Sequence, residues 1–319
     1  MCVHMRRQRS QPLDCMPSAA YSYATALKEI CELEKFGSKL GLGRITRILK
    51  LLGNPQKRYK CILVGGSNGK GSTVEMIGSI LLADGKKVGT YFSPQIEEFP
   101  ERIRVDGKNA GRKEIADAYA EVKEVCSSNR IPATFFEVVT AMALLIFSRR
   151  KVDFAVLEVG LGGRLDATNA VEPEISAIAS LSLEHTDVLG GTIAAIAHEK
   201  CGIARKGKKL VLGIANADAK AAVRKECKAK VAKAVFVEET VDEVHWMQLA
   251  RGTAATPSRQ NMRDPLTRLP LLPWENSRFQ MRWLRLSLEV NWDAAGRRLR
   301  RGCQLSSRNT DSRSFRGAL

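Results

Sequence analysis

Two features common in membrane and secreted proteins are absent from this sequence. It has no uninterrupted apolar run long enough to cross a bilayer, and its first residues, MCVHMRRQRSQ, lack the apolar stretch of a signal peptide. Its eight cysteines are scattered singly without a C-x-x-C pair, which argues against a zinc site and a disulfide framework. We therefore expect a soluble, cytoplasmic protein with reduced thiols and no membrane partner.

Lysine and tryptophan are each missing from one part of the chain. No lysine follows Lys233, and no tryptophan precedes Trp246. Residues 251–319 hold 14 arginines against 5 acidic residues, an excess that supplies more than half of the net charge of +17. The alternation of strand and helix patterns also stops here, so we expect residues 246–319 to form a divergent, poorly ordered tail. Two explanations stay open: the reading frame shifts between about residues 240 and 255, or the tail is genuine.

What the sequence does contain is a phosphate-binding pattern at residues 61–72, CILVGGSNGKGS. An apolar strand at 61–64 runs into four glycines among eight residues, and a periodic helix follows at 73–83. Glycines let backbone N–H groups face a phosphate, a helix N-terminus adds partial positive charge, and a lysine and a serine can contact terminal phosphates and magnesium. The predicted ATP-binding residues are Gly66, Ser67, Asn68, Gly69, Lys70, Gly71 and Ser72.

The spacing of this loop departs from the common pattern G-x-x-x-x-G-K-[ST]. Val64 stands at the first glycine position, and Gly71 separates Lys70 from Ser72. A glycine-rich turn can also be a plain tight connection from a strand to a helix. The apolar strand before it and the helix after it favour the phosphate loop.

The rest of residues 21–245 alternates helices with short apolar strands. This alternation predicts an α/β fold: a P-loop-containing, mainly parallel sheet with helices on both faces, in one ATP-binding domain that follows a polar leader at 1–20. Residues 93–103 are too irregular for an element and are interpreted as a functional loop. The expected helices are 21–36, 45–52, 113–126, 134–147, 193–200 and 217–234, and the other expected strands are 87–92, 153–159, 175–183, 209–214 and 235–238.

Polar residues follow several of these strands at the edge of the sheet where ligands bind in such folds. Ser93 follows one strand, Glu158 ends another, and His185 follows a third, while Lys200 ends a helix. Glu158 is the strongest candidate, because a carboxylate in so apolar a strand costs free energy unless it is paired or metal-bound. Taken alone, His185 is more often a hydrogen-bonded structural histidine than a ligand, and Lys200 is more often a solvated helix lysine.

Taken together, the motifs resemble those of the folylpolyglutamate synthase and dihydrofolate synthase family, which belongs to the Mur ligase superfamily of ATP-dependent amide-forming enzymes. The resemblance covers roughly residues 21–239, and Ser67 and Glu184 stand where the family usually has threonine and aspartate. It implies the fold of the Mur ligase central domain. The matching segments, in order, are FGSKLGLGRI, LGNP, GGSNGKGS, SPQIEEFPERIRVDG, TFFEVVTAMA, LEVGLGGRLDATN, LEHTDVLGGTIAAIAHEKCGI and LVLG.

The resemblance implies a ligase reaction. ATP would phosphorylate a carboxylate of a folate or dihydropteroate, and the amine of L-glutamate would displace the phosphate to form an amide. It also implies one magnesium ion held by Ser72, Ser93 and Glu158 and a second held by Glu158, His185 and Lys200. Lys200 would be carbamylated, since an ammonium cannot ligate a cation. The implied catalytic residues are Lys70, Glu158, His185 and Lys200.

The same resemblance implies a set of folate-binding residues, and several of them also have a simpler structural explanation. The two phenylalanines of that set are equally well explained as core residues, and Arg164 and Asp166 as turn residues. The implied set is Gln95, Ile96, Arg102, Phe135, Phe136, Arg164 and Asp166.

One family feature is missing from the sequence. The family's smaller C-terminal domain, with its D-G-A-H-N type motif, has no counterpart in this chain. Three hypotheses therefore remain: an active glutamate ligase, a nucleotide-binding remnant that cannot complete amide formation, and a basic nucleic-acid-binding protein. The third is disfavoured because the arginines of the tail form no regular stripe. We expect small-molecule substrates, no nucleic acid and a monomer.

Overall fold

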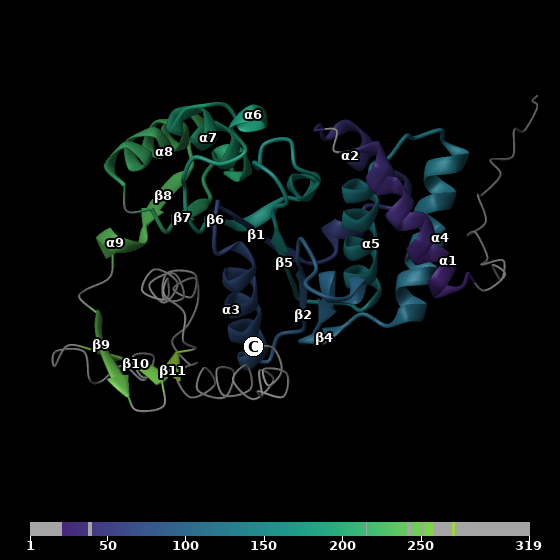
Figure 1. The fold of residues 1–319 in the computed structure, drawn as a ribbon, viewed down its shortest axis with the longest axis horizontal. Helices are drawn as coiled ribbons and strands as arrows, with labels where there is room; N and C mark the ends of the chain where they lie inside the picture. The colour runs from purple at the N-terminus through teal and green to yellow at the C-terminus, as the bar shows by residue number, and fades with distance from the viewer. Residues whose placement is uncertain are drawn as a thin grey trace, which may run out of the picture.

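A computed structural model describes residues 21–37, 40–214, 216–240, 244–249, 252–257 and 270–271 of the chain (Figure 1). Eight strands form one sheet in the order β4-β3-β2-β5-β1-β6-β7-β8, so the strand that precedes the phosphate loop lies at the centre. Pairing is parallel from β2 to β8, whereas β3 and β4 add an antiparallel edge. The strands are β1 Lys60–Gly65, β2 Val88–Tyr91, β3 Ile103–Val105, β4 Lys108–Asn109, β5 Phe154–Glu158, β6 Pro173–Ile178, β7 Lys209–Leu212 and β8 Lys233–Phe236.

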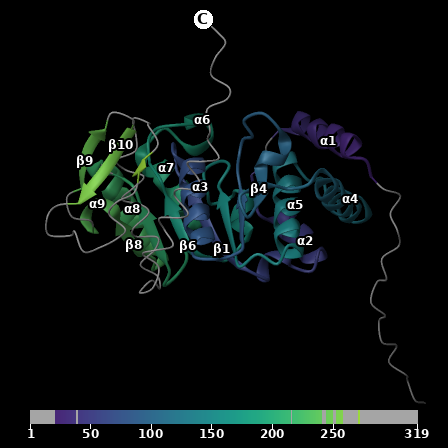
Figure 2. The same ribbon diagram turned by 90° about the horizontal axis from the view of Figure 1, so that it is seen from below.

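Helices cover both faces of this sheet, as predicted (Figures 1 and 2). Because successive strand residues point to opposite faces, Ile62 and Val64 of β1 pack with α3, whereas Cys61 and Leu63 join the larger core beneath the remaining long helices. That larger core contains α5, which is buried along nearly its whole length. The helices are α1 Tyr23–Glu32, α2 Gly43–Leu51, α3 Lys70–Ala83, α4 Arg112–Ser128, α5 Phe135–Arg149, α6 Thr186–Leu189, α7 Ile193–Lys200, α8 Ala217–Lys230 and α9 Val237–Thr240.

Several predicted elements differ from the structure in their boundaries. The strand expected at 235–238 is β8, Lys233–Phe236, and Val237 begins the helix α9. The strand expected at 175–183 ends at Ile178, because the next residues pair with the phosphate loop instead of a strand. The stretch 93–103 is not wholly irregular, since it contains a short 3₁₀-helix, Phe99–Arg102, and leads directly into β3. The helix expected at 217–234 ends at Lys230, because Val231 is left-handed with φ of 55° and the chain then pairs with β7 as β8.

Three further strands lie within residues 244–271, where the sequence shows no periodicity. They are β9 Val244–Leu249, β10 Gly252–Pro257 and β11 Pro270–Leu271, and they form an antiparallel sheet in the order β11-β10-β9. The predicted polar leader and most of the predicted tail lie outside the described residues. Within the described ranges, every helix is too short or too polar to cross a membrane.

Candidate nucleotide and metal site

The phosphate loop connects the central strand to the N-terminus of α3. Gly65 ends β1, and α3 begins at Lys70. Gly66 and Gly69 have φ of 141° and 79°, values that glycine adopts without strain. A Cβ on Gly66 would lie 3.0 Å from the backbone nitrogen of Ser180, so the loop is in contact with the segment that follows β6.

The side chain of Lys70 folds back over this loop. Its Nζ donates to the carbonyl oxygens of Gly66 at 3.1 Å and Ser67 at 3.2 Å. The first N–H groups of α3 have no partner inside the helix, and the helix dipole favours an anion there. Lys70 and the start of α3 therefore place positive charge together, which is the arrangement that binds a phosphate group.

Glu158 lies beside this helix start, at the carboxyl end of β5. It pairs in register with Val64 of the central strand and is only 6% exposed. Its Oε2 accepts a hydrogen bond from the backbone N–H of Ser93 at 3.1 Å, and a Cβ on Gly71 would lie 3.3 Å from the same oxygen. Residues following β1, β2 and β5 therefore meet at one edge of the sheet.

Burial changes the acidity of this carboxyl group. Removal from water raises the pKa of Glu158 to about 6, although the Ser93 N–H and the positive charges of Lys70 and Arg102 favour its ionised form. A buried carboxylate whose negative charge is only partly compensated by its neighbours is suited to bind a cation.

Lys200 lies at the end of α7 and is 1% exposed. Its Nζ donates to Oε1 of Glu184 at 2.6 Å. Burial lowers the pKa of Lys200, the carboxylate of Glu184 opposes that shift, and the positive charge of Lys70 adds to it. Sequence reasoning did not select Glu184 as a site residue, although it stands in the same motif as His185.

His185 is exposed and takes a left-handed conformation with φ of 44° at the start of α6. Its backbone carbonyl accepts hydrogen bonds from the N–H groups of Val188 and Leu189. Across the described residues, no group of three or more His, Cys, Asp or Glu side chains is placed to hold a metal ion. The two-metal set of Ser72, Ser93, Glu158, His185 and carbamylated Lys200 stays a prediction.

A second cluster forms around Arg102. Its guanidinium lies 5.1 Å from the ring centroid of Phe135, and its Nε donates to Oε1 of Gln95. Arg102 is 5% exposed, and burial lowers its pKa. Three members of the predicted folate-binding set thus lie together, whereas Ile96 is 90% exposed and points away from the core.

The other members of that set make contacts within the protein. The ring of Phe136 packs over Gly160, where a Cβ would lie 2.6 Å from Cζ. Asp166 is buried, and its Oδ2 accepts from the backbone N–H of Leu161 at 2.9 Å. Arg164 forms an ion pair with Glu199 at 2.8 Å. These contacts favour the simpler alternative, in which Arg164 and Asp166 shape the turn after β5.

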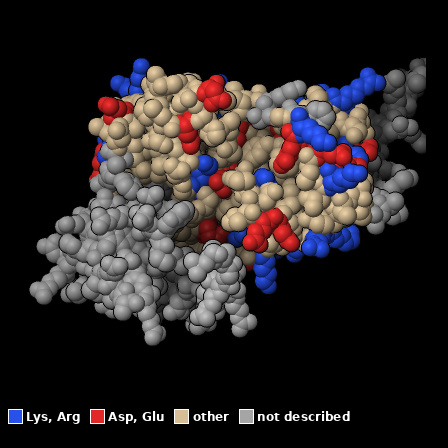
Figure 3. Space-filling view, viewed as in Figure 1, with Lys and Arg blue, Asp and Glu red and all other residues tan. Residues whose placement is uncertain are grey.

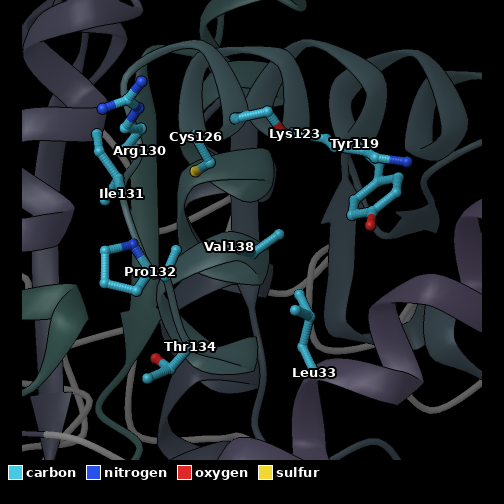
Figure 4. Close-up of a pocket in the computed structure, with 11 residues that line it drawn as sticks. Leu33, Tyr119, Lys123, Cys126, Arg130, Ile131, Pro132, Thr134 and Val138 are labelled. Atoms are coloured by element: carbon cyan, nitrogen blue, oxygen red, sulfur yellow. The ribbon is translucent and has the colours of Figure 1, made fainter.

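A cavity of about 580 Å³ is lined by residues of α4, of the segment that joins α4 to α5 and of the start of α5, and no sequence pattern indicated it. Figure 4 shows Ile131 and Pro132 on one side of it and Leu33 and Tyr119 on the other. The polar side chains of Tyr119 and Lys123 in its lining are already hydrogen-bonded within the protein, because both donate to Oε2 of Glu29. The lining residues are Leu33, Tyr119, Lys123, Cys126, Ser127, Arg130, Ile131, Pro132, Ala133, Thr134 and Val138.

The surface is hollowed between the part that covers α7 and α8 and the part that covers α5 (Figure 3). Acidic and basic side chains meet in this hollow.

Several known proteins are similar to this chain in sequence or in fold. Residues 64–263 match the family described as Mur ligase middle domain. The dihydrofolate synthase/folylpolyglutamate synthase of Bacillus subtilis is 40% identical over 203 residues, which span 62% of this chain and 47% of that protein. The chain thus spans about half, or less, of the length of the curated relatives it matches.

Two solved structures share the fold. Escherichia coli FolC in complex with DHPP and ADP has a TM-score of 0.72 and 31% identity, covering 90% of this chain and 67% of that one. The bifunctional folylpolyglutamate synthase/dihydrofolate synthase of Yersinia pestis, complexed with AMPPNP and Mn ion, has a TM-score of 0.73 and 29% identity, covering 91% and 68%.

Proposed function

Because this chain belongs to the Mur ligase middle-domain family, we propose that it is an ATP-dependent ligase that joins L-glutamate to a folate or dihydropteroate carboxylate. The observation that carries the proposal is the contact between the start of α3 and Glu158, which brings a phosphate loop and a buried carboxylate to one sheet edge. The names of the Bacillus subtilis and Yersinia pestis proteins support the same reaction class.

In this reaction the acceptor carboxylate attacks the γ-phosphorus of ATP, and ADP leaves. The resulting acyl phosphate is attacked by the glutamate amine, which forms the amide and releases phosphate and a proton. The protein's part is to position the groups and to neutralise charge. Lys70 would exchange the carbonyl oxygens of Gly66 and Ser67 for the terminal phosphates, while the first N–H groups of α3 hold the nucleotide.

The residues at this edge fit a divalent cation. Glu158 is buried, its pKa is raised to about 6, and Ser72 and Ser93 add oxygen donors of the kind that Mg²⁺ prefers. Such an ion would neutralise phosphate charge when bound. A second ion would be held by Glu158, His185 and Lys200. Lys200 would then have to leave Glu184, because a carbamate on its nitrogen would face a carboxylate of like charge.

The acceptor would lie near the Arg102 cluster and the start of α5. A cation–π pair between Arg102 and Phe135 offers a flat surface on which a pterin ring can stack. Phe136 fixes the neighbouring turn by packing on Gly160. Escherichia coli FolC, which has the same fold, was solved with DHPP and ADP together.

One observation favours a second candidate function. No D-G-A-H-N type motif occurs among residues 1–319. A nucleotide-binding remnant would hold ATP without completing the amide. Sequencing the gene across codons 235–260 and reading all frames separates a frameshifted ligase from a genuine tail.

Phosphate release tests both functions directly. The full chain is incubated with ATP, Mg²⁺, L-glutamate and either dihydropteroate or tetrahydrofolate, and Lys70→Met is the control. Release that needs glutamate, the acceptor and Lys70 supports the ligase. Nucleotide binding without release identifies the remnant, and absence of both contradicts the proposal.

A further inference from the structure

Two serine hydroxyls join the phosphate loop to the segment that follows β6. The Oγ of Ser180 accepts from the backbone N–H of Asn68 at 2.8 Å and donates to the carbonyl of the same residue at 3.0 Å. The Oγ of Ser67 donates to the carbonyl of Ser182 at 3.2 Å and accepts from its N–H at 3.0 Å. Each hydroxyl therefore pairs with both backbone groups of one residue, as a neighbouring strand would.

The backbones of the two segments are also in direct contact. The Ser67 N–H donates to the Ser180 carbonyl at 3.0 Å. A Cβ on Gly66 would approach the backbone nitrogens of Ala179 and Ser180 to 3.0–3.1 Å, so the segments cannot shift independently there. Residues more than a hundred positions apart in the sequence thus behave as one packed unit.

The same segment continues to the buried ion pair. Two residues after Ser182, Glu184 accepts from Lys200 at 2.6 Å. Residues 180–184 therefore connect the predicted phosphate site to a predicted metal ligand.

We propose that Ser67 and Ser180 are positioning residues that fasten the phosphate loop to residues 180–184, so that nucleotide and divalent cation bind cooperatively. This inference rests on the proposed function, since it requires that the loop binds a nucleotide. The hydroxyl of Ser67 is then used inside the protein and does not face the phosphate. We call these two serines, with Asn68 and Ser182, the serine clasp.

The two serines should contribute unequally. Ser67 is 6% exposed whereas its partner Ser182 is exposed, so water can reach the pair from the Ser182 side but replaces the buried hydroxyl poorly. Ser180 is partly exposed and its partner Asn68 is exposed, so water can substitute in part. A neutral hydrogen bond typically changes an equilibrium by about threefold to tenfold, which sets the expected effects.

The test measures ADP affinity of the full chain by calorimetry, with and without Mg²⁺, for the wild type, Ser180→Ala, Ser67→Ala and Ser67→Thr. Ser79→Ala, in the second half of α3, is the matched control. We expect ADP with Mg²⁺ to bind about threefold more weakly to Ser180→Ala and about tenfold more weakly to Ser67→Ala. Ser67→Thr, which keeps the hydroxyl, should restore affinity.

The decisive readout is the factor by which Mg²⁺ strengthens ADP binding. A clasp that couples the two sites predicts that this factor falls several-fold in both alanine variants, whereas a merely structural contact would leave it unchanged. If the wild type binds ADP and both alanine variants keep its affinity and its Mg²⁺ factor, the clasp is wrong and the proposed function stands. If the wild type binds no ADP, the proposed function itself fails. If Ser67→Ala does not fold, Ser180→Ala decides on the same criteria.

Discussion

Replacing Glu158 with glutamine should stabilise the protein while removing the proposed ligase activity. Glu158 is buried at the end of β5, and its pKa is raised from 4.5 to about 6. The folded state therefore disfavours the ionised form relative to the unfolded chain. Glutamine has nearly the same shape and retains an oxygen that can accept from the Ser93 N–H, but it carries no charge to bury.

The size of the effect follows from the pKa shift. A change from 4.5 to about 6 corresponds to about 2 kcal/mol, at about 1.4 kcal/mol for each unit of pKa. Because folding raises this pKa, protonated Glu158 stabilises the folded state relative to ionised Glu158. This contribution is fully present below pH 4.5 and is lost as the pH rises through about 6. Glu158→Gln should thus be more stable than the wild type by up to about 2 kcal/mol above pH 7, and the difference should become small at pH 4.5 and vanish below it.

Urea unfolding followed by circular dichroism between pH 4.5 and 8, without metal or nucleotide, measures this difference. A matched control is Glu137→Gln, because Glu137 is also buried but accepts from Arg44 at 2.9 Å and from the Thr134 backbone. The control should lose about 1–3 kcal/mol. The reasoning is refuted if Glu158→Gln is less stable than the wild type at pH 8, or if the difference does not change with pH.

Three further predictions concern glycine packing and thiol exposure. Gly89→Ala would place a Cβ 2.5 Å from the buried ring of Phe147, so we expect a loss of about 1–3 kcal/mol in urea unfolding. Gly66→Ala would force a left-handed alanine against backbone atoms at 3.0 Å, so ADP affinity measured by calorimetry should fall at least about tenfold. Among the described cysteines, Cys31 is exposed whereas burial raises the pKa of Cys61 to about 12, so peptide mapping after brief alkylation at pH 8 should show Cys31 labelled first.

Much of the fold could be predicted because its elements carry strong local signals. The apolar run of β1 and the capped, apolar sequence of α5 need no distant partner to be recognised. The end of β6 could not be found this way. Residues 179–183 keep the apolar alternation of a strand, yet their backbone pairs with the phosphate loop, which is distant in sequence.

In the candidate site too, some residues could be selected from the sequence whereas others depend on contacts between distant segments. Glu158 could be selected because a carboxylate in so apolar a strand needs an explanation, whereas Lys70 was selected from the phosphate-loop pattern and Lys200 from the resemblance to the folylpolyglutamate synthase family. The pair between Glu184 and Lys200 could not, because the two residues belong to different elements and meet only when α7 folds back. The cavity of Figure 4 is lined by Leu33, which follows α1, and by residues of α4 and α5, so no single segment of sequence indicates it.

The two buried glutamates show how a structural carboxylate differs from a candidate functional one. Glu137 stands in a T-x-x-E capping box, where Thr134 and Arg44 supply donors to both of its oxygens. Glu158 has the same residue type and similar burial, but within the described part of the chain one backbone N–H, from Ser93, is its hydrogen-bond donor. The first arrangement satisfies its charge and fixes α5, whereas the second leaves charge for a ligand to neutralise. A cation that neutralised this charge would relieve the cost of burying it, and this is why replacing Glu158 should stabilise the fold and abolish the proposed ligase reaction.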